Sequence, residues 1–186
     1  MTYSTLIRRV VCCSLLVAVS PFAFGLPEPG DAAPDFQLQS QTGSKVSLKD
    51  YKGEWIILFF FGDHSSDEIG LAARNLQRDL AKYNAFNASV IGIGRTTPES
   101  NRVWAEKNEL TFTLLADPDQ AIAKAYGVPA EVASSSGNQG IYEVIVAPGG
   151  KVQLPRIAVN NIDGESTSLL ACLQYFKEHP GHTDGP

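Results

Sequence analysis

An uninterrupted apolar run, Trp-Ile-Ile-Leu-Phe-Phe-Phe, occupies residues 55–61 and ends at Gly62. A run without polar alternation, rich in aromatic and branched side chains, is typical of a strand that is buried on both faces of a sheet. In an open α/β sheet, ligands and catalytic groups lie just beyond the carboxyl end of such a strand. We therefore expect the functional site, if there is one, in the polar loop that begins at Gly62.

Apolar residues after this loop recur at helical spacing from Ile69 to Tyr83. Ser65 and Glu68 have the Ser-x-x-Glu form of a capping box, in which both side chains bind backbone N–H groups of the first helical turn. The pattern predicts a helix that begins at about Ser65 and continues to about Tyr83.

Strands and helices are predicted to alternate through the middle of the chain. Buried strands are expected at residues 89–93 and 112–115. Thr97-Pro98 and Asp117-Pro118 each place a capping residue before a proline, which suits the first helical position. They predict a helix at residues 99–108 and a shorter helix that ends at Tyr126, before Gly127.

Short alternating segments at residues 34–38 and 46–48 predict an N-terminal hairpin. A second hairpin is expected from residues 142–147 and 151–154, followed by a final helix at residues 166–178. Alternating strands and helices imply a largely parallel sheet covered by helices, and the second hairpin makes that sheet mixed. The predicted fold class is α/β: a thioredoxin-like fold with a mixed central sheet flanked by helices and an N-terminal β-hairpin extension.

The first 25 residues have the pattern of a secretory signal peptide. Arg8 and Arg9 are followed by an apolar segment at residues 10–19, and Ala23 and Gly25 provide small residues at a cleavage site. The apolar segment is too short for a membrane-spanning helix, which needs about 20 residues. We expect residues 1–25 to be removed, one domain at residues 26–179, and a disordered tail at residues 180–186. The protein would be exported, periplasmic or secreted, without stable membrane insertion after cleavage.

Charge and cysteine content narrow the possible partners. The formal net charge is −5, and loss of Arg8 and Arg9 would make it −7. Because the lysines and arginines do not cluster, we expect no nucleic acid partner. Gly92-x-Gly94 lacks the remaining spacing of a nucleotide-binding loop, so no cofactor is expected. Cys172 would be the one cysteine of the mature chain, which excludes an internal disulfide.

Several motifs, in their order and spacing, resemble the alkyl hydroperoxide reductase/thiol-specific antioxidant (AhpC/TSA) superfamily, the peroxiredoxins. The later motifs are similar to the peroxiredoxin Q (bacterioferritin-comigratory) branch. The resemblance extends from about Gly30 to His179, nearly the whole mature chain. The motifs lie at residues 30–38, 43–53, 99–107, 114–118, 123–128 and 148–152.

This resemblance implies peroxide reduction by a cysteine, but the chain has no cysteine at the expected position. Peroxiredoxins attack peroxide with a low-pKa cysteine thiolate at a helix N-terminus, where the helix dipole and nearby cations favour the anion. The family pattern Pro-x-x-x-Thr/Ser-x-x-Cys places Gly62 at the proline, Ser66 at the hydroxyl residue and Ile69 at the cysteine. An isoleucine can be neither deprotonated nor oxidised in this way.

Two supporting positions of the family also differ. The second cysteine of the peroxiredoxin Q branch corresponds to Arg74, and the activating arginine corresponds to Ile141. No cysteine lies between Cys13 and Cys172, so a shift of the alignment by a few residues does not restore the nucleophile. We assign no catalytic residue and treat Gly62, Ser66 and Ile69 as a degenerate site.

Three functional hypotheses follow. The first is an exported peroxiredoxin-like domain that has lost thiol peroxidase activity and serves as a binding or scaffold protein, with an unidentified partner. The second is an antioxidant oxidoreductase that uses Cys172 or the thiol of a partner, although Cys172 lies beside the apolar face of the last helix, where a structural cysteine is expected. The third is cysteine-independent chemistry, such as metal-assisted hydrolysis, at Asp63, His64 and Ser66.

The third hypothesis has a simpler alternative at each residue. Ser66 is a natural helix cap. The acidic residues near it suit a solvated loop, and His64 is the single local histidine where zinc needs three or four protein ligands. His179 and His182 lie in the tail and could bind a metal only weakly. We therefore expect no metal centre, and the sequence does not predict an oligomeric state.

Overall fold

The computed structural model describes residues 27–129, 140–157 and 161–182. The predicted signal peptide at residues 1–25 and the last four residues of the predicted tail, 183–186, therefore lie outside the described residues. The elements are β1 (Gln37–Ser40), β2 (Lys45–Ser47), the 3-10 helix η1 (Leu48–Tyr51), β3 (Trp55–Phe61), α1 (Asp67–Arg78), α2 (Leu80–Ala85), β4 (Ala88–Gly94), α3 (Pro98–Asn108), β5 (Thr113–Ala116), α4 (Ala121–Ala125), β6 (Ile141–Val146), β7 (Val152–Ile157) and α5 (Ile162–Glu178).

The strands form one mixed sheet in the order β2-β1-β5-β4-β3-β6-β7. β5, β4 and β3 are parallel, whereas β6 and β7 continue the sheet antiparallel. The N-terminal hairpin joins the other side of the sheet, because β1 pairs antiparallel with β5. The predicted mixed sheet with its N-terminal hairpin is confirmed, and the strand at residues 34–38 begins later than expected, at Gln37.

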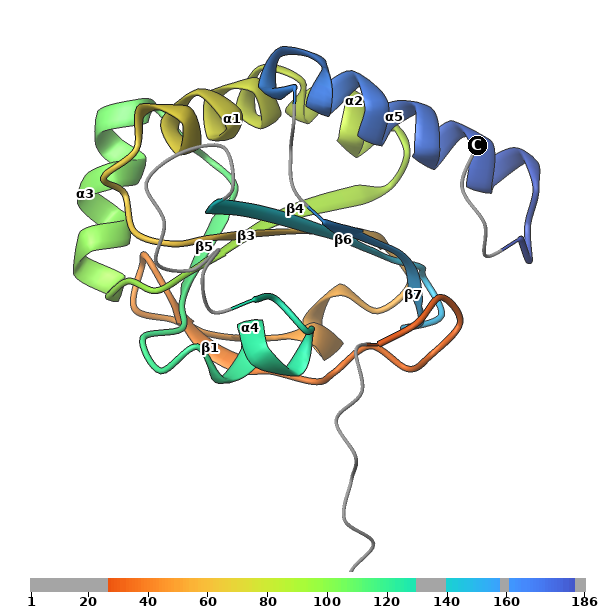
Figure 1. Cartoon of the computed structure of the whole chain (residues 1–186), viewed down its shortest axis with the longest axis horizontal. Helices are drawn as coiled ribbons and strands as arrows, with labels where there is room; N and C mark the ends of the chain where they lie inside the picture. The colour runs from red at the N-terminus through yellow and green to blue at the C-terminus, as the bar shows by residue number, and fades with distance from the viewer. Residues whose placement is uncertain (1–26, 130–139, 158–160, 183–186) are drawn as a thin grey trace, which may run out of the picture.

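The β3 strand supplies side chains to both layers of the core. Ile57, Phe59 and Phe61 belong to the cluster on the side of α1 and α5, which Figure 1 shows above the sheet. Ile56, Leu58 and Phe60 belong to the cluster on the side of α4. Alternate side chains of a strand point to opposite faces, so a strand covered on both faces needs an apolar residue at every position. This accounts for the unbroken run at residues 55–61.

The glycines of β4 allow close packing against β3. A Cβ atom added at Gly92 would lie 2.6 Å from Leu114 Cδ2, and one added at Gly94 would collide with the ring of Phe61. Gly92-x-Gly94 therefore has a packing role in this sheet. The loops after β3 and β4 are also linked, because the backbone N–H of Arg95 donates to the carbonyl oxygen of Gly62 (3.0 Å).

The predicted helix between Ser65 and Tyr83 is wrong in two details. Its N-cap is Ser66, whose side chain accepts from the backbone N–H of Glu68, so α1 begins one residue later than the Ser65 capping box predicts. The helix also breaks at Asp79 into α1 and α2. The break places the Asp79 carboxylate in the protein interior, where the hydroxyl of Ser166 on α5 donates to it (2.8 Å).

The N-termini of α3, α4 and α5 can be compared with the caps predicted from the sequence. Thr97 caps α3 and Pro98 follows it, as predicted. Asp117 does not directly precede α4, which begins after Gln120 in a left-handed conformation. Its carboxylate instead reaches forward and accepts from the N–H groups of Ile122 and Ala123 (3.1 and 2.9 Å), so it caps α4 from a distance. The last helix, α5, begins at Ile162 rather than Ser166 because Asn161 caps it.

Asp79→Asn should destabilise the protein at neutral pH and much less in acid. Hydrogen bonds from Arg78, Lys82 and Ser166 hold the pKa of the buried Asp79 carboxyl far below its usual range. A lowered folded-state pKa contributes stability above the unfolded value of about 4, and this contribution is lost as the pH falls through the folded value. We expect a loss of about 1–2 kcal/mol in the free energy of unfolding at pH 7, measured by urea denaturation.

The difference in the free energy of unfolding between the wild type and Asp79→Asn should become smaller below about pH 4. Asp119→Asn is the matched control, because Asp119 is an exposed aspartate outside this network. A difference for Asp79→Asn that stays constant from pH 7 to pH 3 would contradict the role assigned to the carboxylate.

Candidate functional site

The polar loop at residues 62–66 lies at the carboxyl end of β3 and leads directly into α1. This is the position that the sequence predicts for a site. The loop adjoins the loop after β4 through the bond from Arg95 N–H to Gly62. Its residues divide into side chains that enter the core and side chains that cap local backbone.

Ile69, which the sequence predicts at the position of the family cysteine, is fully buried, with 0% of its surface exposed. It lies in the first turn of α1 and belongs to the same apolar cluster as Phe61 and Ile141. Ile141, which the sequence predicts at the position of the family arginine, pairs with Phe61 across β3 and β6 and is also 0% exposed. The positions expected for an anion and its stabilising cation are thus filled together by aliphatic side chains.

Ser66 and Asp63 have local capping roles. The Ser66 hydroxyl accepts from the backbone N–H of Glu68 (3.2 Å) and also bonds the Glu68 carboxylate. The Asp63 carboxylate accepts from the side chain and the backbone N–H of Ser65, which lowers the pKa of Asp63. Arg95 lies 3.9 Å from Asp63 and adds a weaker attraction, since both side chains are largely exposed.

His64 turns away from Ser66 and packs against α3. Its ring stacks on Trp104, with ring centroids 4.4 Å apart and planes at 17°. Its Nε2 atom lies 3.0 Å from Oδ1 of Asn101, a side chain that is 0% exposed. Burial lowers the pKa of His64, although the bond to Asn101 and the charge of Asp63 oppose this shift.

These contacts do not support the hypothesis of joint chemistry at Asp63, His64 and Ser66. The three side chains bond different partners: Ser65, Asn101 and Glu68. Within the described residues, no group of three or more histidines, cysteines, aspartates or glutamates is placed to hold a metal ion. The contacts described for this loop therefore include no hydrogen bond between Ser66 and His64.

The sequence does not indicate the partners of His64. Trp104 belongs to the family motif at residues 99–107, and Asn101 has no sequence signal that links it to the loop. Asn101 and Trp104 are three residues apart on α3, so they share one face of the helix. The signal that could have found them is this spacing on the helix that follows the neighbouring parallel strand.

A shallow groove of about 470 Å³ opens beside His64. It follows the outer side of α3, and Val103 contributes a side chain that is 55% exposed. The groove combines an apolar floor with charged groups of both signs. Its lining residues are His64, Thr97, Glu99, Ser100, Val103, Trp104 and Lys107.

The remaining predicted residues lie away from the loop. Arg74, at the position of the second family cysteine, is exposed and donates from Nη1 to Oδ1 of Asn108 (2.7 Å). Cys172 lies on α5, is 6% exposed and belongs to the apolar cluster beneath that helix. Its burial agrees with the structural role expected from the sequence.

The comparison with protein families finds a match between residues 29–166 and the AhpC/TSA family model. Among curated proteins, a putative peroxiredoxin of Mycobacterium tuberculosis is 34% identical over 55% of this chain and 66% of its own length. Chloroplastic peroxiredoxin Q of Populus jackii is 30% identical over 70% of this chain and 61% of its own length. The chain thus spans less than two thirds of the length of these relatives.

Solved structures support the predicted fold. The crystal structure of peroxidoxin BcpB from Mycobacterium tuberculosis matches with a TM-score of 0.69 and 21% identity, covering 80% of this chain and 97% of that chain. Peroxiredoxin Q of Xanthomonas campestris matches with a TM-score of 0.67 and 19% identity, covering 80% and 92%. The expected thioredoxin-like fold, of the peroxiredoxin type, is confirmed.

Proposed function

The chain belongs to the AhpC/TSA family, and we propose that it is an exported member that has lost thiol peroxidase activity and serves as a binding scaffold. The observation that carries this proposal is the complete burial of Ile69 at the nucleophile position. The two curated relatives described above are named as peroxiredoxins. Under this proposal, the chain lacks the peroxidase activity that the names of these relatives imply.

The physical argument concerns the charge that a peroxidatic site must hold. A reactive thiolate needs nearby cations or backbone dipoles to favour the anion. Here Ile69, Phe61 and Ile141 form part of one apolar cluster, and an uncompensated charge among them would carry a large desolvation cost. At the helix N-terminus that would face the anion, Ser66 already binds the backbone N–H of Glu68. The loop is thus built for packing and capping.

The alternative of a redox enzyme that uses Cys172 receives no support from its surroundings. Its thiol lies within the apolar cluster between α5 and the sheet. Reactive cysteines occupy partly exposed, electropositive surroundings, whereas buried structural cysteines are inert. The loop at residues 62–66 contacts α1 and α3, whereas Cys172 lies on α5. Cys172 therefore does not stand in for the missing nucleophile at the loop.

The groove beside His64 is the best candidate for the binding surface. It adjoins the loop where the family performs its chemistry, and Val103 and Trp104 supply apolar surface to it. Glu99 and Lys107 add one group of each charge. A small apolar or aromatic group on a partner or a ligand fits this combination, with the charged groups fixing its orientation.

Export is proposed from residues 1–25, which have the signal-peptide pattern. In the part of the chain that the structure describes, no helix combines the length and the apolar character needed to cross a membrane.

The mature protein should consume hydrogen peroxide no faster than its Cys172→Ala variant when a thiol reductant is present. The reason is that no other cysteine remains after residue 25. The measurement is peroxide loss over time, with a peroxiredoxin Q enzyme as the positive control. Thiol-dependent turnover by the wild type that disappears in Cys172→Ala would establish the redox alternative.

Val103→Glu should abolish binding of apolar and aromatic fragments at the groove without lowering the melting temperature. The measurement is the change in backbone amide NMR shifts on addition of a fragment set, with shifts expected within residues 97–107. Leu71→Glu is the matched control, because Leu71 is also an exposed large hydrophobic residue, at 38%, and lies on α1. Shifts that survive Val103→Glu, or an absence of shifts in the wild type, would argue against this surface.

Expression of the full chain in a bacterium with a secretory pathway should yield an exported protein that begins at Leu26. Intact mass and N-terminal sequencing of the periplasmic fraction measure this cleavage. Replacing Arg8 and Arg9 with glutamate should retain the precursor in the cytoplasm, because a signal peptide needs a basic amino-terminal region. If the wild-type chain stays uncleaved in the cytoplasm of the bacterium, the proposal of export is wrong.

A further inference from the structure

The end of α5 carries a compact turn that holds two histidines. His179 is the C-cap of α5, and Pro180 and Gly181 follow it. The backbone N–H of His182 donates to the carbonyl oxygen of His179 (3.2 Å), and Gly181 has a φ of +96°. Proline followed by a glycine with positive φ is the pattern of a tight reverse turn. The turn brings residues 179 and 182 together, where the predicted domain at residues 26–179 meets the segment expected to be a disordered tail, residues 180–186.

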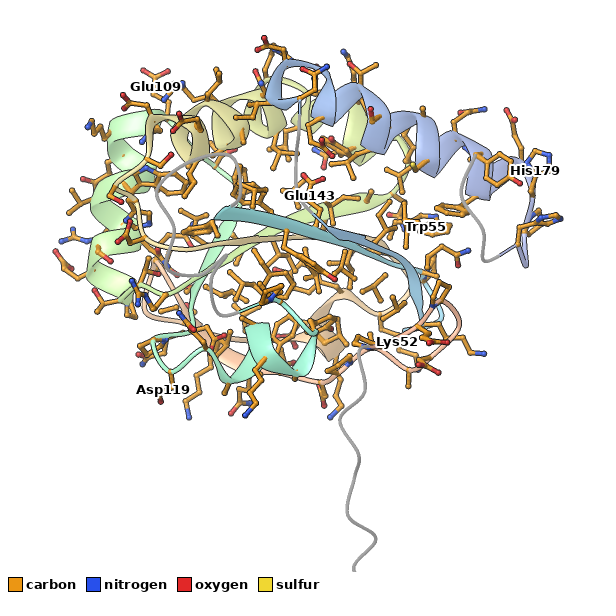
Figure 2. All side chains as sticks on the ribbon, viewed as in Figure 1. Lys52, Trp55, Glu109, Asp119, Glu143 and His179 are labelled. Carbon is orange, nitrogen blue, oxygen red and sulfur yellow. The ribbon has the colours of Figure 1, made fainter. Side chains whose placement is uncertain are left out.

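The two imidazole rings are close to one another and exposed. Their centroids are 5.7 Å apart, with planes at 70°. Tyr175, one helical turn earlier, stacks on His179 with centroids 4.4 Å apart and meets the ring of His182 edge-on at 6.3 Å. Figure 2 shows His179 at the far end of α5, at the periphery of the molecule. Gln153 on β7 also donates to the carbonyl oxygen of His182, which ties the turn to the sheet.

A hydrogen bond determines which nitrogen of His179 carries the proton. Its Nδ1 atom lies 2.9 Å from the carbonyl oxygen of Tyr175. A carbonyl oxygen can only accept, so Nδ1 is the donor and the lone pair of neutral His179 lies on Nε2. Metal-ligating histidines commonly donate their other ring N–H to a backbone carbonyl in this way, which fixes the tautomer and the orientation of the ring.

We propose that His179 and His182 form a binding site for a divalent transition metal ion that prefers imidazole ligands, with Cu²⁺ bound more tightly than Zn²⁺. A metal–nitrogen distance of about 2.0–2.1 Å implies that two imidazoles on one ion have centroids about 4.5–6.3 Å apart. The observed 5.7 Å lies inside this interval. Imidazole suits copper, nickel and zinc, and affinity for a given site rises toward Cu²⁺.

The site has two protein ligands and an open side. Within the described residues, no set of three or more histidine, cysteine, aspartate or glutamate ligands is present here or elsewhere. With two imidazole ligands from the described residues, the affinity should be modest compared with that of a closed structural site, which has three or four protein ligands. Protons compete with the ion for the imidazole nitrogens, so binding weakens on acidification.

The chain contains three histidines, which makes the test direct. The untagged mature protein is titrated with Cu²⁺ by calorimetry at pH 7.5, and the complex is examined by electron paramagnetic resonance. We expect one ion per chain and hyperfine splitting from two nitrogen donors. His179→Gln and His182→Gln should each weaken Cu²⁺ binding on the order of tenfold or more and remove one nitrogen from the spectrum.

Two variants serve as controls for the other Cu²⁺-binding side chains. His64→Gln and Cys172→Ala should bind Cu²⁺ with the affinity and the spectrum of the wild type, because both residues lie within the fold away from the turn. Metal-free melting temperatures should be equal for the wild type and the two tail variants, since His179 and His182 are exposed. Unchanged Cu²⁺ binding in both tail variants, or loss of binding in His64→Gln or Cys172→Ala alone, would overturn the proposal.

Discussion

Phe61 lies on the backbone of β4, and this contact fixes where the site loop leaves the sheet. Its ring occupies the space that a side chain at position 94 would need. The same ring lies 5.3 Å from the ring of Trp104 and 5.6 Å from that of His64, measured between centroids. One aromatic residue at the end of β3 thus joins the strand, the loop and α3.

Function follows from the same packing. In a peroxiredoxin the first turn of the helix after β3 must leave room for an anion, which needs dipoles and a cation around it. In this protein the apolar layer of β3 continues without interruption into Ile69 of α1 and Ile141 of β6. Under the proposed function, this apolar cluster occupies the position where the sequence predicts the family's reactive group. What remains polar, at Asp63 and Ser66, serves to end the strand and begin the helix.

The sequence predicts the framework well because the framework depends on periodicity and on short-range caps. The run at residues 55–61 and the Thr97-Pro98 cap are local signals, and the structure contains what they predict. The break at Asp79 is different, because it is stabilised by Ser166, which is 87 residues away in the chain. Asp117 caps α4 from five and six residues before the amides that it binds, outside the usual spacing.

The candidate site was predicted only in part for the same reason. The sequence locates the loop and identifies Ile69, since both follow from position along the chain. It does not indicate that His64 would bond Asn101, because that contact joins residues 37 positions apart through the arrangement of β3 and α3. Likewise, the closeness of His179 and His182 depends on a turn whose hydrogen bond and ring contacts appear only in three dimensions.

The composition of the core has a chemical consequence beyond folding. After residue 25 the chain contains no methionine and one cysteine, so residues 26–186 have a single sulfur atom. That atom, in Cys172, is buried beneath α5. Thiolates and thioethers are the side chains that oxidants attack first, and their oxidation can proceed to irreversible acids. Residues 26–186 therefore offer peroxide one buried sulfur atom, and we expect this part of the chain to resist oxidation under conditions that progressively inactivate a cysteine-dependent peroxidase.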